Sequence, residues 1–206
     1  MRTLLLIDLQ RDFCPGGALA VPEGNAVVPI ANALMMRFEH VVATQDWHPA
    51  NHSSFAANHL WRKPGQVIEI NGLEQVLWPI HCVQESFGAA FHPDVHTDGI
   101  DRTFVKGTDP MIDSYSGFYD NGHRKDTGLG DYLKAQGTMA VYIAGLATDY
   151  CVKYSALDAV QLGFDTFVVQ DACRGVNLEA GDDARAFEEM AARGVQLITS
   201  SELLTT

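Results

Sequence analysis

Short apolar runs alternate with longer amphipathic segments along the chain. The short runs are rich in Leu, Ile and Val and end at polar residues, a pattern typical of strands that are buried on both faces. They lie at residues 3–7, 40–44, 103–105, 139–144, 166–169 and 195–198. Apolar residues recur at helical spacing in four further segments, at 25–38, 129–136, 149–162 and 182–193. The pattern therefore predicts strands and helices in alternation.

This alternation predicts a three-layer α/β/α fold. Helical connections keep successive strands parallel, so we expect a Rossmann-like, mostly parallel central sheet of about six strands with helices on both faces. At roughly 150 residues per domain, a chain of this length forms one domain, which we expect to span residues 1–206.

The segment from residue 47 to residue 99 departs from the alternation. It contains Pro, Gly, Asn, His and Trp without a sustained period. Irregular segments of this length in compact domains are usually functional. Its aromatic residues, among them Trp61 and Trp78, argue against a disordered insert. We therefore expect an ordered, functional insertion here.

Composition and charge exclude several classes of partner. Fourteen Lys and Arg against 26 Asp and Glu give a formal net charge of −12, which repels nucleic-acid phosphates, and no basic run offsets it. No apolar stretch approaches the ~20 residues that span a bilayer, and the N-terminal run is too short for a signal peptide. Four cysteines without a CxxC pair fit a reducing compartment. We expect a cytoplasmic protein that binds neither nucleic acid nor membrane.

Three reactive side chains follow the ends of predicted strands. Asp8 closes the first strand, Lys106 closes the third, and Cys151 follows the fourth in the first turn of a helix. The carboxyl ends of parallel strands meet at one edge of the sheet, so these side chains are expected to meet. The helix dipole and the ammonium would lower the pKa of the thiol, and the carboxylate could accept its proton. Singly, each residue has a purely structural interpretation, but their coincidence favours a cysteine nucleophile.

Local motifs narrow the chemistry further. The turn at residues 145–148 offers backbone N–H groups for an oxyanion hole beside Cys151. The chain contains neither GxxxxGK[ST] nor GxGxxG, which argues against a nucleotide site. Asp8 also lacks the second acid, two residues on, that an aspartyl-phosphate phosphatase would have.

A second cluster of polar residues begins the insertion. Asp46 and His48 are two residues apart, so their side chains share a face of an extended backbone, and His81 follows in the segment WPIHC. One carboxylate and two imidazoles suit a divalent transition metal with open coordination positions. We expect zinc, with iron or manganese as alternatives. The pattern leaves open whether His52 is a fourth ligand.

Five long stretches resemble the nicotinamidases of the isochorismatase-like cysteine hydrolase family. They are LLLIDLQRDFCPGGALAV, VVATQDWHPANHSSF, WPIHCVQ, FVKGTDPMIDSYSGFYDN and IAGLATDYCVKYSALDA. The resemblance runs nearly end to end and implies the fold of this family. It implies a catalytic triad of Asp8, Lys106 and Cys151. It also implies metal ligands at Asp46, His48 and His81, although members differ on a further ligand at the position of His52.

The resemblance implies three further features of the site. A cis peptide bond would precede Ala147, so that the N–H groups of Ala147 and Cys151 face the oxyanion. Phe13 and Trp78 match positions that contact the substrate ring. Tyr115 lies in the matching SYSGF stretch and is expected to contact the substrate as well.

The implied activity is hydrolysis of nicotinamide to nicotinate and ammonia through a cysteine thioester, as a step of NAD salvage. Pyrazinamide should be cleaved too, because it keeps the ring nitrogen and the carboxamide. One alternative is a related amidase for another small amide, such as an N-carbamoyl compound, which the metal cluster disfavours. Another is a non-catalytic ligand- or metal-binding protein, which the intact triad disfavours. Isochorismatases of the same fold lack the nucleophilic cysteine, so Cys151 argues against that group. The sequence leaves open whether the protein forms a homo-oligomer.

Overall fold

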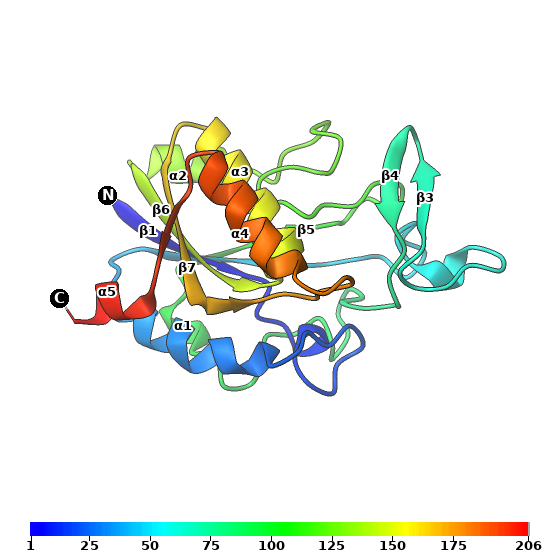
Figure 1. Ribbon diagram of the computed structural model, residues 1–206, viewed down its shortest axis with the longest axis horizontal. Helices are drawn as coiled ribbons and strands as arrows, with labels where there is room; N and C mark the ends of the chain where they lie inside the picture. The colour runs from blue at the N-terminus through cyan, green and yellow to red at the C-terminus, as the bar shows by residue number, and fades with distance from the viewer. Residues whose placement is uncertain (206) are drawn as a thin grey trace.

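A parallel six-stranded sheet forms the centre of the computed structural model, which describes residues 1–205 (Figure 1). The strand order is β5-β2-β1-β6-β7-β8, and every neighbouring pair is parallel, as predicted. The strands are β1 (Arg2–Ile7), β2 (Val41–Asp46), β5 (Arg102–Lys106), β6 (Ala140–Leu146), β7 (Asp165–Arg174) and β8 (Gln196–Ile198). The chain order reverses on either side of β1, and ligands bind at such a switch point.

Helices cover both faces of the sheet and complete the predicted three layers (Figure 1). On β1, Leu4 and Leu6 belong to the core on one face, and Leu5 and Ile7 belong to the core on the other. The continuous apolar run of β1 follows from this burial on both sides. One face carries α1 (Val27–Met35) and α5 (Ser200–Leu204), and the other carries α2 (Leu129–Ala135), α3 (Lys153–Gln161) and α4 (Asp182–Ala192).

Two elements at the carboxyl end of the sheet differ from the sequence prediction. Strand β6 continues through Gly145 to Leu146, which the sequence assigns to a turn. Gly145 has a φ of +131°, and a Cβ there would overlap the backbone of Ile7, so only glycine permits this close passage beside β1. The helix predicted over 149–162 begins instead with a π-helical turn at Thr148–Val152. π-Helical turns occur frequently at functional sites.

A hairpin within the segment 47–99 was not predicted. Strands β3 (Val67–Ile70) and β4 (Leu73–Val76) pair antiparallel around Asn71 and Gly72, which both have positive φ. An Asn-Gly pair between apolar positions is the ordinary signal for such a two-residue turn, and the sequence contains it. The rest of the segment is irregular but well buried in places, since Phe55 is fully buried and Trp78 is 4% exposed.

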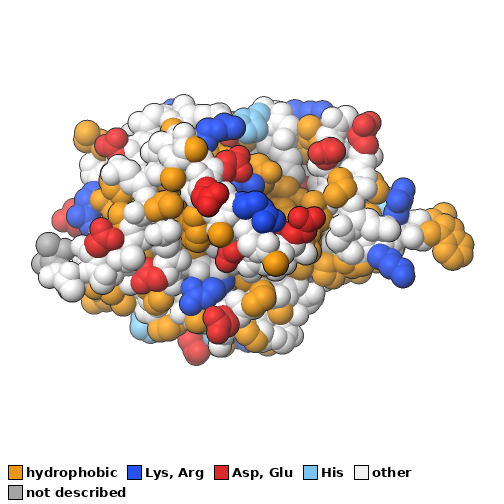
Figure 2. All heavy atoms as spheres, in the orientation of Figure 1, with side chains coloured by type: hydrophobic (Ala, Val, Ile, Leu, Met, Phe, Trp, Pro, Cys, Tyr) orange, Lys and Arg blue, Asp and Glu red, His pale blue; other side chains and the backbone are white. Residues whose placement is uncertain are grey.

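The surface does not gather positive charge on the face shown in Figure 2, where acidic and basic side chains are interspersed. Within residues 1–205, no helix is long and apolar enough to span a lipid bilayer. The short helix α5, which the sequence pattern did not predict, lies beside α1 at the C-terminal end of the chain (Figure 1).

Candidate active site

Asp8, Lys106 and Cys151 meet at the carboxyl edge of the sheet. Asp8 follows β1, Lys106 ends β5, and Cys151 lies in the π-helical turn after β6. The Lys106 ammonium is 2.8 Å from Asp8 Oδ2 and donates to Cys151 Sγ at 3.3 Å. All three side chains are buried. The structure thus places the predicted triad around one ammonium group.

Several polar groups hold this ammonium and the Asp8 carboxylate in place. Lys106 also pairs with the Asp46 carboxylate and donates to the Ser114 carbonyl oxygen at 3.1 Å. Thr44 donates its hydroxyl to Asp8 Oδ1 at 2.6 Å. Asp46 therefore links the triad directly to the histidine cluster, a connection that the sequence did not predict.

Burial dominates the protonation of the triad. It would lower the pKa of Lys106, but Asp46 and Asp8 outweigh it and hold this pKa well above its ordinary value. Burial raises the pKa of Cys151, and the opposing effect of Lys106 does not cancel it. Burial likewise raises the pKa of Asp8, against the effect of Lys106. The expected low pKa of the Cys151 thiol is therefore wrong for the resting site.

One carbonyl group accepts two hydrogen bonds from the turn that carries Cys151. The N–H groups of Tyr150 and Val152, on either side of Cys151, both donate to the Ala147 carbonyl oxygen at 3.1 Å. The peptide bond between Leu146 and Ala147 is cis, as the resemblance implied. Ala147 and Cys151 both line the same pocket, which is the placement that an oxyanion hole requires.

Asp46, His48 and His81 offer ligand atoms that all lie within 4.8 Å of one another. Nδ1 of His48 lies 2.8 Å from the Gly107 carbonyl oxygen, and Nδ1 of His81 lies 2.8 Å from that of Pro79. A carbonyl only accepts, so each Nδ1 carries a proton and each Nε2 keeps its lone pair. These Nε2 atoms lie 3.5 and 3.7 Å from Asp46 Oδ2. The donor set, with its oriented imidazoles, fits a divalent transition metal.

Gln10 fixes the position of Asp46 and was not singled out from the sequence. Its side-chain amide donates to the Asp46 carbonyl oxygen and accepts the Asp46 N–H, both at 2.8 Å, and it also donates to the Ala89 carbonyl oxygen. Gln10 is fully buried. The only sequence signal for its role was its place two residues after Asp8, near the end of the same strand. Gly107 leaves space for the His48 ring, because a Cβ at Gly107 would overlap the imidazole.

His52 lies beside the ligand cluster, with its ring centroid 4.3 Å from that of His48. It is fully buried, and burial lowers its pKa to about 4. Its Nδ1 accepts the Ser54 N–H at 3.2 Å. Its ligand atom groups with those of His48 and Asp113, rather than with those of Asp46 and His81.

One pocket unites the predicted substrate contacts with the reactive thiol. Cys151 and His81 both line it. Phe13 packs edge-on against His81 with ring centroids 5.6 Å apart, and Trp78 packs edge-on against Tyr150 at 4.8 Å. Such aromatic walls suit a flat ring. The lining residues are Phe13, Leu19, Asp46, Trp78, His81, Asp113, Tyr115, Ala147, Tyr150, Cys151 and Val176. Of these, Leu19, Asp113, Tyr150 and Val176 were not predicted.

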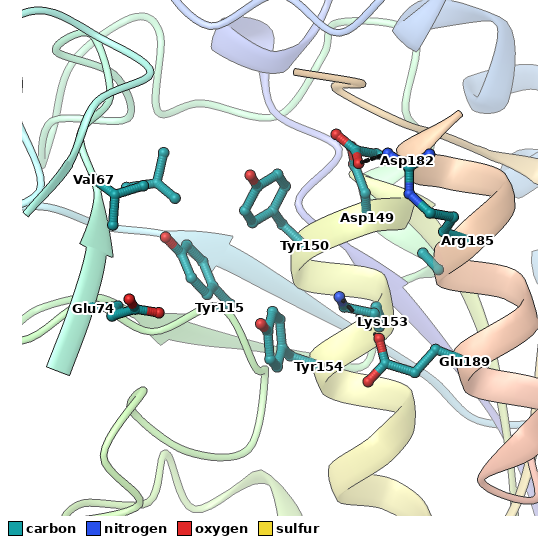
Figure 3. Close-up of a pocket in the computed structure, with 12 residues that line it drawn as sticks. Val67, Glu74, Tyr115, Asp149, Tyr150, Lys153, Tyr154, Asp182, Arg185 and Glu189 are labelled. Atoms are coloured by element: carbon teal, nitrogen blue, oxygen red, sulfur yellow. Dashed lines mark hydrogen bonds and ion pairs between the residues drawn. The ribbon is translucent and has the colours of Figure 1, made fainter. Parts of the chain in front are cut away.

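An outer hollow adjoins this pocket and shares Tyr115 and Tyr150 with it. Figure 3 shows these two rings and Tyr154 between the β3–β4 hairpin and helix α3. The rings of Tyr115 and Tyr154 stack with centroids 5.4 Å apart, and Trp78 Nε1 lies 3.4 Å from the Tyr115 hydroxyl. Tyr115 and Tyr150 therefore form the wall between the hollow and the inner pocket.

A buried thiol beside a carboxylate, an ammonium and a backbone turn defines the class of cysteine hydrolases that cleave small amides. The model of the family described as "Isochorismatase: Isochorismatase domain" matches residues 2–202. The chain belongs to this family.

Similar proteins cover almost the whole chain. The nicotinamidase of Escherichia coli K12 is 52% identical, over 98% of this chain and 96% of its own. A solved nicotinamidase/pyrazinamidase of Acinetobacter baumannii has a TM-score of 0.96 at 46% identity, with 98% of each chain covered. A pyrazinamidase of Pyrococcus horikoshii, solved in complex with zinc, has a TM-score of 0.77 at 38% identity and covers 96% of this chain and 98% of its own.

Proposed function

We propose that this protein hydrolyses nicotinamide to nicotinate and ammonia, with Cys151 as the nucleophile. The family and the nicotinamidases that match over the full chain support an amidohydrolase of this type in NAD salvage. The observation that carries the proposal is the Lys106 ammonium, which contacts both Asp8 and Cys151 below an aromatic pocket. Pyrazinamide is a second substrate, since it presents the same carboxamide and the same ring nitrogen.

The reaction proceeds in two halves on the same three side chains. Asp8 accepts the thiol proton as Cys151 Sγ bonds to the amide carbon, and the N–H groups of Ala147 and Cys151 stabilise the oxyanion. The C–N bond then breaks, ammonia leaves with the proton from Asp8, and a thioester remains. Water attacks the thioester with Asp8 as base, nicotinate leaves, and Asp8 returns the proton to the thiolate.

Lys106 lets Asp8 alternate between its two protonation states. The raised pKa of Cys151 keeps the resting nucleophile as a neutral thiol, so the thiolate forms only when Asp8 takes the proton. The nearby ammonium stabilises that thiolate, because it donates to Sγ. The raised pKa of Asp8 in turn makes it a better proton acceptor than an exposed carboxylate.

Asp46, His48 and His81 would hold one divalent metal, with zinc favoured because a pyrazinamidase relative is solved with zinc. When bound, the metal supplies a Lewis acid for the pyridine nitrogen. Phe13 and Trp78 pack the ring between this end of the pocket and Cys151. The chain itself therefore orients the carboxamide toward the thiol.

The four cysteines are free and buried. Free thiols persist in a reducing compartment. This supports our proposal that the protein acts in the cytoplasm.

Ammonia release from a panel of small amides tests the proposed function. The purified zinc-loaded protein should release ammonia from nicotinamide and pyrazinamide much faster than from N-carbamoyl compounds. Preference for an N-carbamoyl substrate would instead support the related amidase. Ligand binding without any ammonia release would support a non-catalytic protein of the same fold.

Asp8→Asn and Lys106→Ala should each lower kcat by at least about 10²-fold, which is the usual cost of losing a positioned acid or base group. Neither loss should add to that of Cys151→Ala, because the three residues act as a unit. Lys106→Ala also leaves two buried carboxylates unpaired, at a cost of about 3–5 kcal/mol, so kcat is measured below its lowered Tm. Normal turnover by a folded Lys106→Ala protein would remove Lys106 from the mechanism.

The pH profile of kcat/KM should show an acid limb above the ordinary Asp pKa of 3.8, because burial raises the pKa of Asp8. Asp8 accepts a proton only when ionised, so activity falls as the pH drops through this raised pKa. The measurement is initial rates of ammonia release from low nicotinamide concentrations, with Tm recorded at each pH to exclude unfolding. A folded enzyme that keeps full activity below pH 3.8 would contradict the role of Asp8.

A further inference from the structure

Asp113 is a buried carboxylate in the substrate pocket that the catalytic steps do not use. It lines the pocket with Cys151 and is 4% exposed. Its Oδ1 accepts the Ser114 N–H at 2.8 Å, and its Oδ2 accepts a hydrogen bond from Gln75 Nε2 at 3.0 Å. Among the ion pairs of residues 1–205, none includes Asp113. A buried carboxylate without a cation is costly, so its surroundings call for a positive charge.

The buried charges around the pocket do not balance within the described chain. Asp8 and Cys151 share one negative charge, whichever of them holds the proton, and Asp46 and Asp113 each carry another. The Lys106 ammonium supplies one positive charge to this group. With both carboxylates ionised and the imidazoles neutral, as metal ligands must be, two negative charges remain, and one divalent cation neutralises them.

Asp113 lies next to the proposed metal ligands. One of its carboxylate oxygens is within 4.8 Å of a ring nitrogen of His48 and of a ring nitrogen of His52. His48 also belongs to the group formed with Asp46 and His81. The carboxylate is thus close enough to act on a cation bound there, because the interaction of two charges in a buried site is weakly screened.

The hydrogen bonds of His52 define its tautomer. Its Nδ1 accepts the Ser54 N–H at 3.2 Å and lies 2.7 Å from Ser54 Oγ. A backbone N–H can only donate, so Nδ1 carries the lone pair and the proton of the neutral ring is on Nε2. No group within residues 1–205 meets hydrogen-bond geometry with this buried Nε2, and, against the larger effect of burial, the nearby Ile112 backbone raises the pKa of the ring. A protonated ring nitrogen cannot ligate a metal, but it can donate to a carboxylate.

We propose that Asp113 is an outer counter-charge for the divalent metal held by Asp46, His48 and His81, and that His52 is a donor toward Asp113 and not a fourth ligand. Groups just outside a ligand set typically change metal affinity by about 10–100-fold. Asp113 raises the affinity by its charge, and His52 orients it. The inference rests on the proposed metal site, but it is tested by binding and not by turnover.

Zinc affinity, measured by competition with a chromophoric chelator, tests the role of Asp113. Asp113→Asn should raise the zinc dissociation constant by about 10–100-fold, and Asp113→Ser should match it. Asp113→Glu, which keeps the charge, should recover much of the loss. The matched control is Asp109→Asn, which removes an exposed carboxylate that also accepts a backbone N–H in the same loop; it should leave the constant unchanged. An unchanged constant in the folded Asp113→Asn and Asp113→Ser proteins would overturn the proposal.

Cobalt substitution separates a ligand from an outer group. The visible spectrum of the Co²⁺-loaded protein should keep its shape in Asp113→Asn and His52→Asn, with one ion per chain, whereas His81→Ala should change it. Loss of the spectrum in His52→Asn and Asp113→Asn, with retention in His81→Ala, would overturn the proposal. It would assign the ion to the group formed by His48, His52 and Asp113. Ammonia release at saturating zinc is recorded in parallel: a protein inactive on nicotinamide whose zinc affinity still depends on Asp113 would contradict only the proposed function.

Discussion

Cys151→Ala should lower kcat for nicotinamide by at least about 10⁴-fold, since removal of the nucleophile from a catalytic unit abolishes covalent catalysis. The substitution removes one buried sulfur atom, so the fold should persist with a decrease in Tm of about 4 °C or less. The measurement is ammonia release together with a thermal unfolding scan. The sulfur of Cys151 is irreplaceable because it contacts Lys106 and faces the pocket.

Cys173→Ala is the matched control for this substitution. Cys173 is also buried, but its thiol donates to the Val169 carbonyl oxygen and lies outside the pocket. Turnover by this variant should stay within a few-fold of the unmodified protein. A Cys151→Ala protein that keeps more than a few per cent of the activity would rule out the thioester mechanism.

Benzamide, which lacks the ring nitrogen, should be cleaved up to about 10⁴-fold less efficiently than nicotinamide in the zinc-loaded protein. When a site is built to bind a polar group, a substrate that lacks this group leaves the site's own polar partner unpaired. Discrimination of this size follows. Picolinamide and isonicotinamide should also be poor substrates, because their nitrogen lies at another distance from the carboxamide. The measurement is kcat/KM for each of the four amides.

Removal of the metal should abolish this discrimination. Chelation or His48→Ala should lower kcat/KM for nicotinamide toward the value for benzamide and leave benzamide almost unchanged. Equal values for the two amides in the zinc-loaded protein would contradict recognition of the ring nitrogen at the metal. A large loss of benzamide turnover on chelation would indicate that the metal acts on the carbonyl or on water.

The sequence predicted the sheet and its reactive edge because both depend on local patterns. Leu5 and Ile7 on one face, with Leu4 and Leu6 on the other, make β1 apolar throughout, and this can be read without coordinates. Asp8 and Lys106 stand at strand ends in the sequence, so their convergence with Cys151 follows from parallel topology.

Other features depend on three-dimensional surroundings that the sequence does not display. The low pKa expected for Cys151 rested on the effects of its helix turn and of Lys106. Burial has the larger effect and raises that pKa. Gln10, which follows β1, contacts the backbone of Asp46 at the end of the neighbouring strand β2, and no local pattern predicts that pairing. Asp113 is one of many acidic residues until its burial beside His48 is known.

The central claim is a thioester on Cys151, and rapid-quench peptide mass spectrometry tests it most directly. Zinc-loaded protein is mixed with excess nicotinamide, stopped in acid within one turnover and digested. The account predicts a nicotinoyl adduct on the peptide that contains Cys151, absent from Cys151→Ala and from protein mixed with nicotinate. Release of ammonia with no adduct on Cys151 at any time within the first turnover, or an adduct on another residue, would contradict it.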